Sequence, residues 1–169
     1  FENISQYPEF VLQAIWYDEL PTKAGAVWGG MPSQAAWNRL APTGTVRNLK
    51  ERASIVAYRT HGGQPFHYIV RSYDERGRVE AILRLTENLG FDAVYYSYNS
   101  MNSVVSIHTL DPFNQHATFY GYDASGRVSG VWTAQSQNGL GLSTMPYKPQ
   151  LIERPTGSAD VVYSYDIMN

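Results

Sequence analysis

Cysteine is absent from the 169 residues of this chain. Its absence excludes disulfides, thiolate metal sites and cysteine nucleophiles. A domain of this length buries about 70% of the surface that its unfolded chain exposes, so it can be stable without cross-links. We therefore expect a single domain that spans residues 1–169.

An excess of one charge and long hydrophobic runs are also lacking. The 13 Lys and Arg residues and the 15 Asp and Glu residues give a net charge of −2 at pH 7, and like charges do not cluster. This balance predicts no nucleic-acid partner. No run approaches the ~18 consecutive apolar residues of a transmembrane helix, so we expect no membrane span. The chain starts with Phe1 rather than Met, which is compatible with a removed signal peptide.

Known motifs for catalysis and for cofactors are missing as well. The sequence contains no Walker loop, dinucleotide fingerprint or zincin motif. His61 precedes two glycines as in an esterase oxyanion loop, but no Gly-x-Ser-x-Gly elbow accompanies it, and a hairpin turn explains the glycines. The four histidines are not spaced like metal ligands: His61, His67, His108 and His116. We therefore expect no enzyme activity, no catalytic residues, no metal and no cofactor.

What the sequence does contain is a repeated unit that starts with Tyr-Asp. Residues 73–79 read YDERGRV and residues 122–128 read YDASGRV. Residues 98–104, YNSMNSV, are a looser copy, and residues 165–169, YDIMN, begin a fourth. Asp favours the start of a type I turn, and Gly or Asn accepts the positive φ that follows it in a three-residue hairpin loop. Each copy therefore predicts the tip of a β-hairpin.

These tips predict the register of the strands and the faces of the sheet. The expected cross-strand pairs are Tyr73 with Val79, Tyr98 with Val104, Tyr122 with Val128, Arg71 with Ala81, Tyr96 with Ser106, and Tyr120 with Gly130. One face is expected to carry Tyr96, Tyr98, Tyr120, Tyr122, Tyr163 and Tyr165. The other face is expected to carry the small residues Ser72, Ser97, Gly121 and Ser164 and the apolar residues Val70, Tyr95, Phe119, Val162, Ile82, Ile107 and Val131.

The rest of the chain adds helices before the repeats and more strands. Residues 8–20 form a mostly apolar segment between two prolines, which predicts a helix, and residues 33–40 predict a second helix capped by Ser33. Further strands are expected at residues 45–50, 53–59 and 66–74. The predicted fold is mainly β, an antiparallel twisted β-meander of about eight strands. It occupies residues 44–169, with the helical segment of residues 1–43 packed on one face.

A long connection, residues 135–160, separates the third and fourth copies. Connections of more than ~12–15 residues are often functional, and tyrosine is common on recognition surfaces. The candidate binding residues are Tyr96, Tyr98, Tyr120, Tyr122, Tyr163, Tyr165, Trp132, Met145, Tyr147 and Lys148. A structural interpretation also stands, in which the tyrosines stiffen the sheet and residues 150–153 add a short strand to a mobile insertion. The strand expected at residues 161–166 would be an edge that can pair with another chain.

The Tyr-Asp-x-x-Gly-Arg-Val unit resembles the signature of the YD-repeat (RHS-type) family of bacterial secreted and surface proteins. Residues 44–51, GTVRNLKE, are similar to the opening of short secreted bacterial proteins of this type. The resemblance covers roughly residues 44–169. It implies a β-meander whose repeats are structural rather than catalytic, and a location that is secreted, periplasmic or on the cell surface.

Together these features predict a non-catalytic, secreted or envelope-associated bacterial scaffold that binds a protein or a glycan. One alternative is an inhibitor or immunity-like protein that blocks a partner enzyme with a hairpin tip or with the long connection. Another alternative is a hydrolase in which His61 or His108 meets an Asp only in space.

Overall fold

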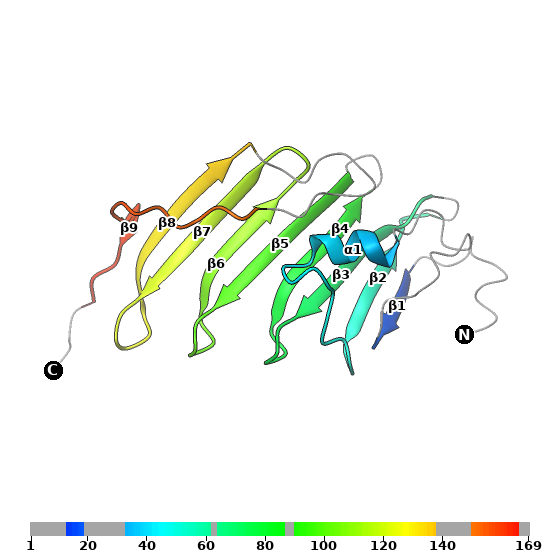
Figure 1. The fold of residues 1–169 in the computed structure, drawn as a ribbon, viewed down its shortest axis with the longest axis horizontal. Helices are drawn as coiled ribbons and strands as arrows, with labels where there is room; N and C mark the ends of the chain where they lie inside the picture. Colours follow the sequence, from blue (N-terminus) through cyan, green and yellow to red (C-terminus); the bar gives the residue numbers. More distant parts are fainter. Residues whose placement is uncertain (1–12, 19–32, 62–63, 87–89, 138–149, 166–169) are drawn as a thin grey trace.

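A computed structural model describes residues 13–18, 33–61, 64–86, 90–137 and 150–165. These residues form one antiparallel sheet whose nine strands follow each other in chain order, together with one short helix (Figure 1). The elements are β1 (Gln13–Tyr17), α1 (Gln34–Leu40), β2 (Ala53–Tyr58), β3 (His67–Tyr73), β4 (Val79–Thr86), β5 (Gly90–Tyr98), β6 (Val104–Leu110), β7 (Gln115–Tyr122), β8 (Val128–Ser136) and β9 (Val161–Val162). The prediction of a mainly β, open antiparallel meander is confirmed.

The tips that join β3 to β4, β5 to β6 and β7 to β8 have the predicted loop geometry. The residue in the glycine position has a positive φ in each tip, with Gly77 at 77°, Asn102 at 66° and Gly126 at 78°. Its N–H donates to the carbonyl of the Asp or Asn that opens the turn, as Gly77 does to Asp74 at 2.9 Å. The side chain of that Asp or Asn accepts backbone N–H bonds from the residues two and four positions later.

A β-bulge next to each tip shifts the register that the motif alone predicts. Tyr73 lies opposite Val79 as expected, but the next pair is Ser72 with Ala81, so Glu80 is an extra residue in β4. Bulges of this kind re-aim the side chains of the strand that carries them. Three predicted pairs are therefore wrong, because Arg71 lies opposite Ile82, Tyr96 opposite Ile107 and Tyr120 opposite Val131.

The same bulges move apolar residues from one face of the sheet to the other. A shift of one residue turns a side chain to the opposite face. The prediction that Ile82, Ile107 and Val131 share a face with Val70 is therefore wrong, since they lie beside Tyr96 and the other tyrosines. We call the face of Tyr96, Ile107 and Val131 the open face. The opposite face, which carries Val70, is called the covered face.

The core of the protein lies on the covered face. Val70, Leu83, Ala93 and Leu110 form one cross-strand row through β3, β4, β5 and β6, and all four side chains are fully buried. Helix α1 lies over this part of the sheet and belongs to the same buried cluster (Figure 1). Within the described part of the chain, the sheet thus has a hydrophobic core on this side only.

Helix α1 agrees with the second predicted helix. Ser33 caps it by accepting a hydrogen bond from the backbone N of Ala36 at 3.3 Å. Trp37 packs edge-on against Phe91, with ring centroids 5.3 Å apart. The hydroxyl of Tyr95 donates to the carbonyl of the last helical residue at 2.6 Å, which satisfies one of the carbonyls that a helix end leaves free. Burial raises the pKa of Tyr95, so this hydroxyl keeps its proton.

Residues 150–160 cross the covered face farther along the sheet, over β6 to β8, and we call them the strap (Figure 1). Leu151 packs against the core cluster, and the side chain of Gln115 donates to the carbonyl of Gln150 at 3.4 Å. At the other end, the indole N–H of Trp132 donates to the carbonyl of Gly157 at 3.1 Å. The short strand expected at residues 150–153 is wrong, because this backbone is irregular.

The helix expected at residues 8–20 is wrong where the structure describes it. Residues 13–17 form β1, which pairs antiparallel with β2 from Gln13 to Tyr17. Burial alternates along the strand, as it does when one face of a strand is covered. Pairing with β2 outweighs the helical pattern that the flanking prolines suggest. Residues 8–12 and 19–20 lie outside the described part of the chain.

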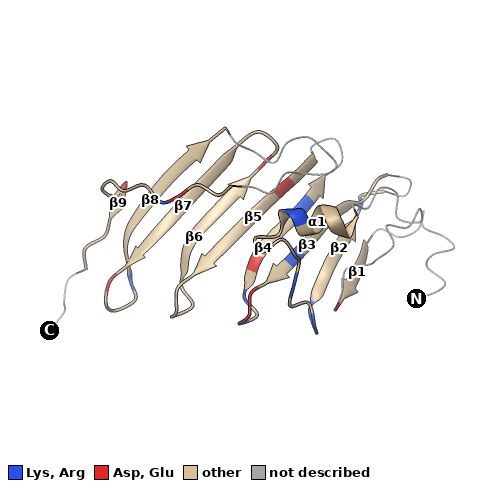
Figure 2. Cartoon of the chain, viewed as in Figure 1, with Lys and Arg blue, Asp and Glu red and all other residues tan. Residues whose placement is uncertain are grey.

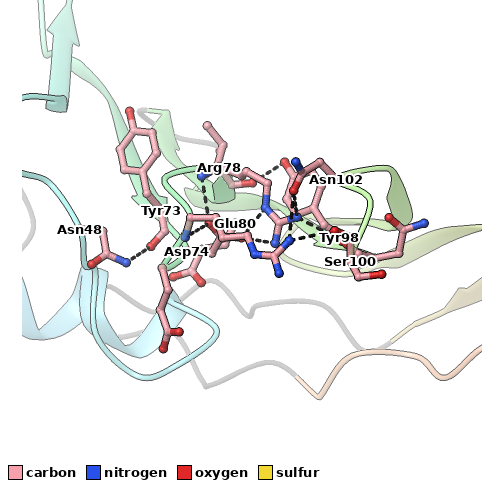
Figure 3. A network of polar contacts seen from close by, with 12 residues as sticks. Asn48, Tyr73, Asp74, Arg78, Glu80, Tyr98, Ser100 and Asn102 are labelled. Carbon is pink, nitrogen blue, oxygen red and sulfur yellow. Dashed lines mark hydrogen bonds and ion pairs between the residues drawn. The ribbon is translucent and has the colours of Figure 1, made fainter.

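The strand expected at residues 45–50 is also wrong. Residues 46–49 are irregular, and Asn48 has a left-handed φ of 57° that ends any extended run. This segment nevertheless docks on the end of β3, where the carbonyl of Arg47 accepts from the N–H of Tyr73 at 3.2 Å. The side chain of Asn48 donates to the carbonyl of Tyr73 at 2.8 Å (Figure 3). Arg47 also pairs at 2.9 Å with Glu80, the extra residue of the bulge.

The first hairpin, β1 and β2, is a further copy of the repeat. Tyr17 lies opposite Ala53, and a bulge follows this pair as it does in the later hairpins. The N–H of Asp18 donates to the carbonyl of Arg52 at 3.1 Å, as the Asp or Asn that opens each later tip does to the residue four positions on. Glu51 has a φ of 61° in the position that Gly or Asn takes in the later tips. Tyr17-Asp18 and Glu51-Arg52-Ala53 are therefore the two ends of one repeat unit.

Residues 19–50 interrupt the tip of this first unit. Only residues 75–76 fill the same position in the next hairpin, between Asp74 and Gly77. The interruption contains α1 and residues 46–49, both of which lie against the sheet that the later units build. An insertion in one hairpin tip thus supplies part of the cover for the hairpins that follow.

The tyrosine of each later unit ties its hairpin to the hairpin before it. The hydroxyl donates to the carbonyl of the first residue of the strand that follows the preceding tip. These hydrogen bonds join Tyr73 to Ala53 at 3.4 Å, Tyr98 to Val79 at 2.7 Å, Tyr122 to Val104 at 2.6 Å and Tyr165 to Val128 at 2.8 Å. We call this contact the tyrosine staple.

An arginine of the preceding tip also lies on the ring of three of these tyrosines. The guanidinium-to-centroid distances are 5.1 Å for Arg52 and Tyr73, 4.4 Å for Arg78 and Tyr98, and 4.3 Å for Arg127 and Tyr165. Figure 3 shows Arg78 between Asp74 of its own tip, 2.6 Å away, and Tyr98 of the next. A contact of this kind contributes about 0.5–1 kcal/mol at an exposed site. The Arg of the motif therefore links neighbouring hairpins.

Replacing Tyr98 by Phe removes the staple hydroxyl and keeps the ring. We expect the free energy of unfolding to fall by about 1 kcal/mol, which is the net contribution of one hydrogen bond. Tyr96→Phe is the matched control, because its hydroxyl makes no hydrogen bond among the described residues, and it should change stability by less than about 0.5 kcal/mol. Urea denaturation followed by circular dichroism measures both, and equal losses would contradict the staple.

Candidate functional site

Away from the tips, two cross-strand rows on the open face of β5 to β9 contain tyrosine. One row consists of Tyr96, Ile107, Thr118 and Thr133, and the other of Tyr120, Val131 and Val161. Both tyrosines are half-buried, so each shows part of its ring to solvent. Apolar area next to hydrogen-bonding groups is typical of a recognition surface.

The predicted tyrosines divide into two groups by the use of their hydroxyls. Tyr98, Tyr122 and Tyr165 use theirs in staples, so these hydroxyls are already occupied. Within the described part of the chain, the hydroxyls of Tyr96 and Tyr120 make no hydrogen bond. The latter two tyrosines can therefore offer both ring and hydroxyl to a partner.

Strands β6, β7 and β8 contain no Lys, Arg, Asp or Glu. Figure 2 shows charged residues at the tips and on β3, β4 and β5, whereas β6 to β8 are free of them. We call the open face of these three strands the neutral strip. Its side chains are Ile107, Thr109, His116, Thr118, Tyr120, Val131, Thr133 and Gln135. The three strands themselves therefore offer a partner no charge to desolvate, which would be costly, and the carboxylate of Asp160 borders the strip at Thr133.

A hollow of about 610 Å³ lies in the neutral strip. Its lining consists of His116, Ala117, Thr118, Thr133, Ala134 and Gln135. The pairs across the hollow are His116 with Gln135 and Thr118 with Thr133. The lining therefore combines an imidazole, an amide and two hydroxyls. Ligand sites in proteins have volumes of about 300–1,000 Å³, so the hollow is of a size to hold part of a partner.

Asp160 fixes the hydroxyl at one side of this hollow. Its carboxylate accepts hydrogen bonds from the hydroxyl of Thr133 at 2.7 Å and from the backbone N–H of the same residue at 2.6 Å. The hydroxyl bond, followed by the backbone bond, holds the pKa of Asp160 below its usual value. Because the Thr133 hydroxyl donates its proton to Asp160, its oxygen is left as an acceptor.

Trp132 lies on the covered face, away from the neutral strip. Its ring lies over Gly121 and Gly130, where an added Cβ would be 3.0 Å from the ring atoms. The guanidinium of Arg154 stacks on the ring at 4.6 Å. Trp132 therefore anchors the strap, and its indole N–H is already used by Gly157.

The other candidate residues of the long connection cannot be placed. Met145, Tyr147 and Lys148 lie outside the described residues. Tyr163 follows β9 and is exposed, and its backbone N–H donates to the carbonyl of Ser129 at 3.1 Å.

The two histidines of the hydrolase alternative do not meet a carboxylate among the described residues. His61 is exposed, and its Nδ1 lies 3.1 Å from the hydroxyl of Thr60. His108 is buried on the covered face, with its ring edge-on to Phe119 at 5.3 Å. Burial lowers the pKa of His108, and its Nδ1 has no hydrogen-bond partner. Among the described residues, neither histidine has the carboxylate partner that would orient it as a general base.

No group of three or more His, Asp or Glu side chains among the described residues could hold a metal ion. Among the helices in the part of the chain that the structure describes, none is long and apolar enough to cross a membrane.

Four side chains of the hollow were not among the sequence candidates: His116, Thr118, Thr133 and Gln135. A signal for two of them was present, because His116 and Thr118 alternate with Tyr120 along one strand. The two residues of β8 were missed because of the bulge. A register without the bulge places Thr133 and Gln135 on the covered face.

Comparisons of the chain with protein-family models, with curated proteins and with solved structures found no match. The resemblance to YD-repeat proteins therefore rests on the motif residues alone. It stays a prediction, as does the location that it implies.

Replacing Gly130 by Ala should loosen the strap. The new Cβ would lie 3.0 Å from the ring of Trp132 and 3.2 Å from the Cβ of Ala159. We expect unfolding free energy to fall by about 1–3 kcal/mol, the usual cost of overpacking, and proteolysis within the strap to accelerate. Gly157→Ala is the control, since its Cβ would meet nothing within 4 Å. Equal stability and protease resistance of the two variants would show that the strap is not seated on Gly130.

Proposed function

We propose that this chain is a non-catalytic binding protein of the YD-repeat type, secreted or attached to the bacterial cell envelope. In this proposal it presents the neutral strip to a protein or glycan partner. The observation that carries the proposal is the difference between the two faces of the sheet. Helix α1 and the strap lie on one face, while the other exposes His116, Thr133 and Gln135 around a hollow.

The use of the motif residues supports a scaffold role for the repeats. Asp74 and Asp123 are held in their tips by backbone N–H groups and by the Arg of the same motif. A hydrogen bond from the backbone N–H of Arg127, and then one from its side chain, holds the pKa of Asp123 below its usual value. These carboxylates are stabilised as anions and bound in turns, so they are poor proton acceptors for catalysis. The repeats build the platform, and the residues between motifs are free to bind.

The double substitution Tyr96→Ala and Tyr120→Ala should abolish partner capture. Exposed tyrosines that anchor an interface often contribute 2 kcal/mol or more, so we expect the retained material to fall by at least about 30-fold. The measurement is capture of proteins and glycans from bacterial envelope extracts on the immobilised chain, with circular dichroism to verify folding. Protease digestion and periodate oxidation of the extract then tell a protein partner from a glycan.

The matched control is Phe113→Ala. Phe113 is an exposed aromatic residue in the turn between β6 and β7, so its removal costs similar apolar area at a different place. It should leave capture unchanged. Capture that survives the double substitution, or that is lost equally in the control, would contradict the assignment of the binding site to the open face.

A further inference from the structure

The hollow of the neutral strip presents its polar side chains in a compact rectangle. His116 and Thr118 lie two positions apart on β7, and Gln135 and Thr133 lie opposite them on β8. Neighbouring strands are about 5 Å apart, and positions two residues apart on one strand are separated by about 7 Å. The rectangle therefore has the dimensions of a single pyranose ring.

The hydrogen-bonding capacity of this lining matches the hydroxyl groups of a sugar. The amide of Gln135 both donates and accepts, as do the hydroxyl of Thr118 and the two nitrogens of an uncharged imidazole such as that of His116. The oxygen of Thr133 is left as an acceptor because its proton goes to Asp160. Each sugar hydroxyl is a donor and an acceptor at once, so it can use two neighbouring groups of the lining together.

A protein partner finds a less suitable surface in this hollow. Protein interfaces depend on apolar or aromatic anchors that fill dry pockets. An anchor seated between Thr118 and Thr133 would cover hydroxyl, amide and imidazole groups without replacing their hydrogen bonds to water, and a buried polar group left unpaired is costly. The lining therefore favours a ligand that brings hydroxyl groups of its own.

The charges around the hollow favour an uncharged sugar. The strands that line it, β7 and β8, contain no Lys or Arg. The carboxylate of Asp160 borders the hollow at Thr133. Carboxylate and phosphate groups of ligands are typically bound by Arg or Lys. Here the anionic groups of an acidic glycan would instead approach a charge of their own sign.

Tyr120 extends this site along β7. It follows Thr118 by two positions, so both side chains lie on the open face, and its ring is half-buried. Its cross-strand neighbour on this face is Val131. An aromatic ring offers a flat apolar surface, and the C–H groups on one side of a sugar ring pack against such a surface. A sugar unit next to the one in the hollow would therefore meet the ring of Tyr120.

We propose that the hollow binds one ring of an uncharged glycan and that Tyr120 packs against the next ring of the same glycan chain. The glycan then runs along β7, with its hydroxyl groups on the polar lining and one apolar side on the tyrosine. This inference rests on the proposed function, because it names the class of partner that the open face binds.

Glycan-array binding of the 169-residue chain tests the class of ligand. The neutral probes are immobilised oligosaccharides of glucose, galactose, mannose and N-acetylglucosamine, and the acidic probes are heparin and polygalacturonate. We expect retention on a neutral probe and none on the acidic probes. Gln135→Leu and Thr118→Val keep most of the volume of the lining but remove an amide and a hydroxyl. Each should weaken binding to the retained probe by about 10-fold or more, with circular dichroism to verify folding.

The matched control is Thr86→Val. Thr86 lies on β4, outside the hollow, so the loss of its hydroxyl should leave glycan binding unchanged. No retention on any neutral probe, equal retention on the acidic probes, or equal binding by the three variants would overturn the proposal. Capture from envelope extracts that needs Tyr96 and Tyr120 but resists periodate would also overturn it. That last result would leave the proposed function intact, because the open face would then bind a protein.

Discussion

The tyrosine staple is the contact on which the rest of this structure depends. The ladder that joins one hairpin to the next stops short of the tips, because the pairs of β4 with β5 end at Ala81 and Tyr95. The hydroxyl of Tyr98 reaches the carbonyl of Val79 in the preceding hairpin, and Arg78 of that hairpin lies on its ring. The same contact recurs from Ala53 to Tyr165, so successive hairpins are joined near their tips in the same way. The regular spacing of Tyr and Arg in the sequence reflects these contacts between neighbouring hairpins.

Two insertions then make the sheet asymmetric. Residues 19–50 leave the first tip and residues 137–160 leave the end of β8, and the described parts of both lie on the covered face. A sheet that buries one hydrophobic face needs a second layer packed on that face, because the repeats themselves form only one layer. The open face keeps Tyr96, Tyr120 and the hollow of the neutral strip accessible, and this difference is why we assign binding to that face.

The sequence was most informative where a residue has one conformational role. Gly77, Asn102 and Gly126 take the positive φ that the motif requires, so the tips were predicted correctly. The bulges were not, since the extra residues Glu80, Val105 and Ser129 have no common side-chain type that would mark them. Because the bulges were not predicted, Ile107 was assigned to the wrong face of the sheet. For the same reason, half of the polar side chains that line the hollow were not identified. The first unit escaped notice for another reason, because the two ends of its motif, Tyr17 and Arg52, are far apart in the chain.

A double-mutant cycle on Arg78 and Tyr98 measures the link between hairpins most directly. The variants are Arg78→Ala, Tyr98→Leu and their combination, compared by urea denaturation. If the arginine of one tip holds the tyrosine of the next, the two losses will not add, and the coupling free energy will be about 0.5–1 kcal/mol in favour of the pair. Strictly additive losses would contradict the account, because they would show that neighbouring units are held by strand pairing alone.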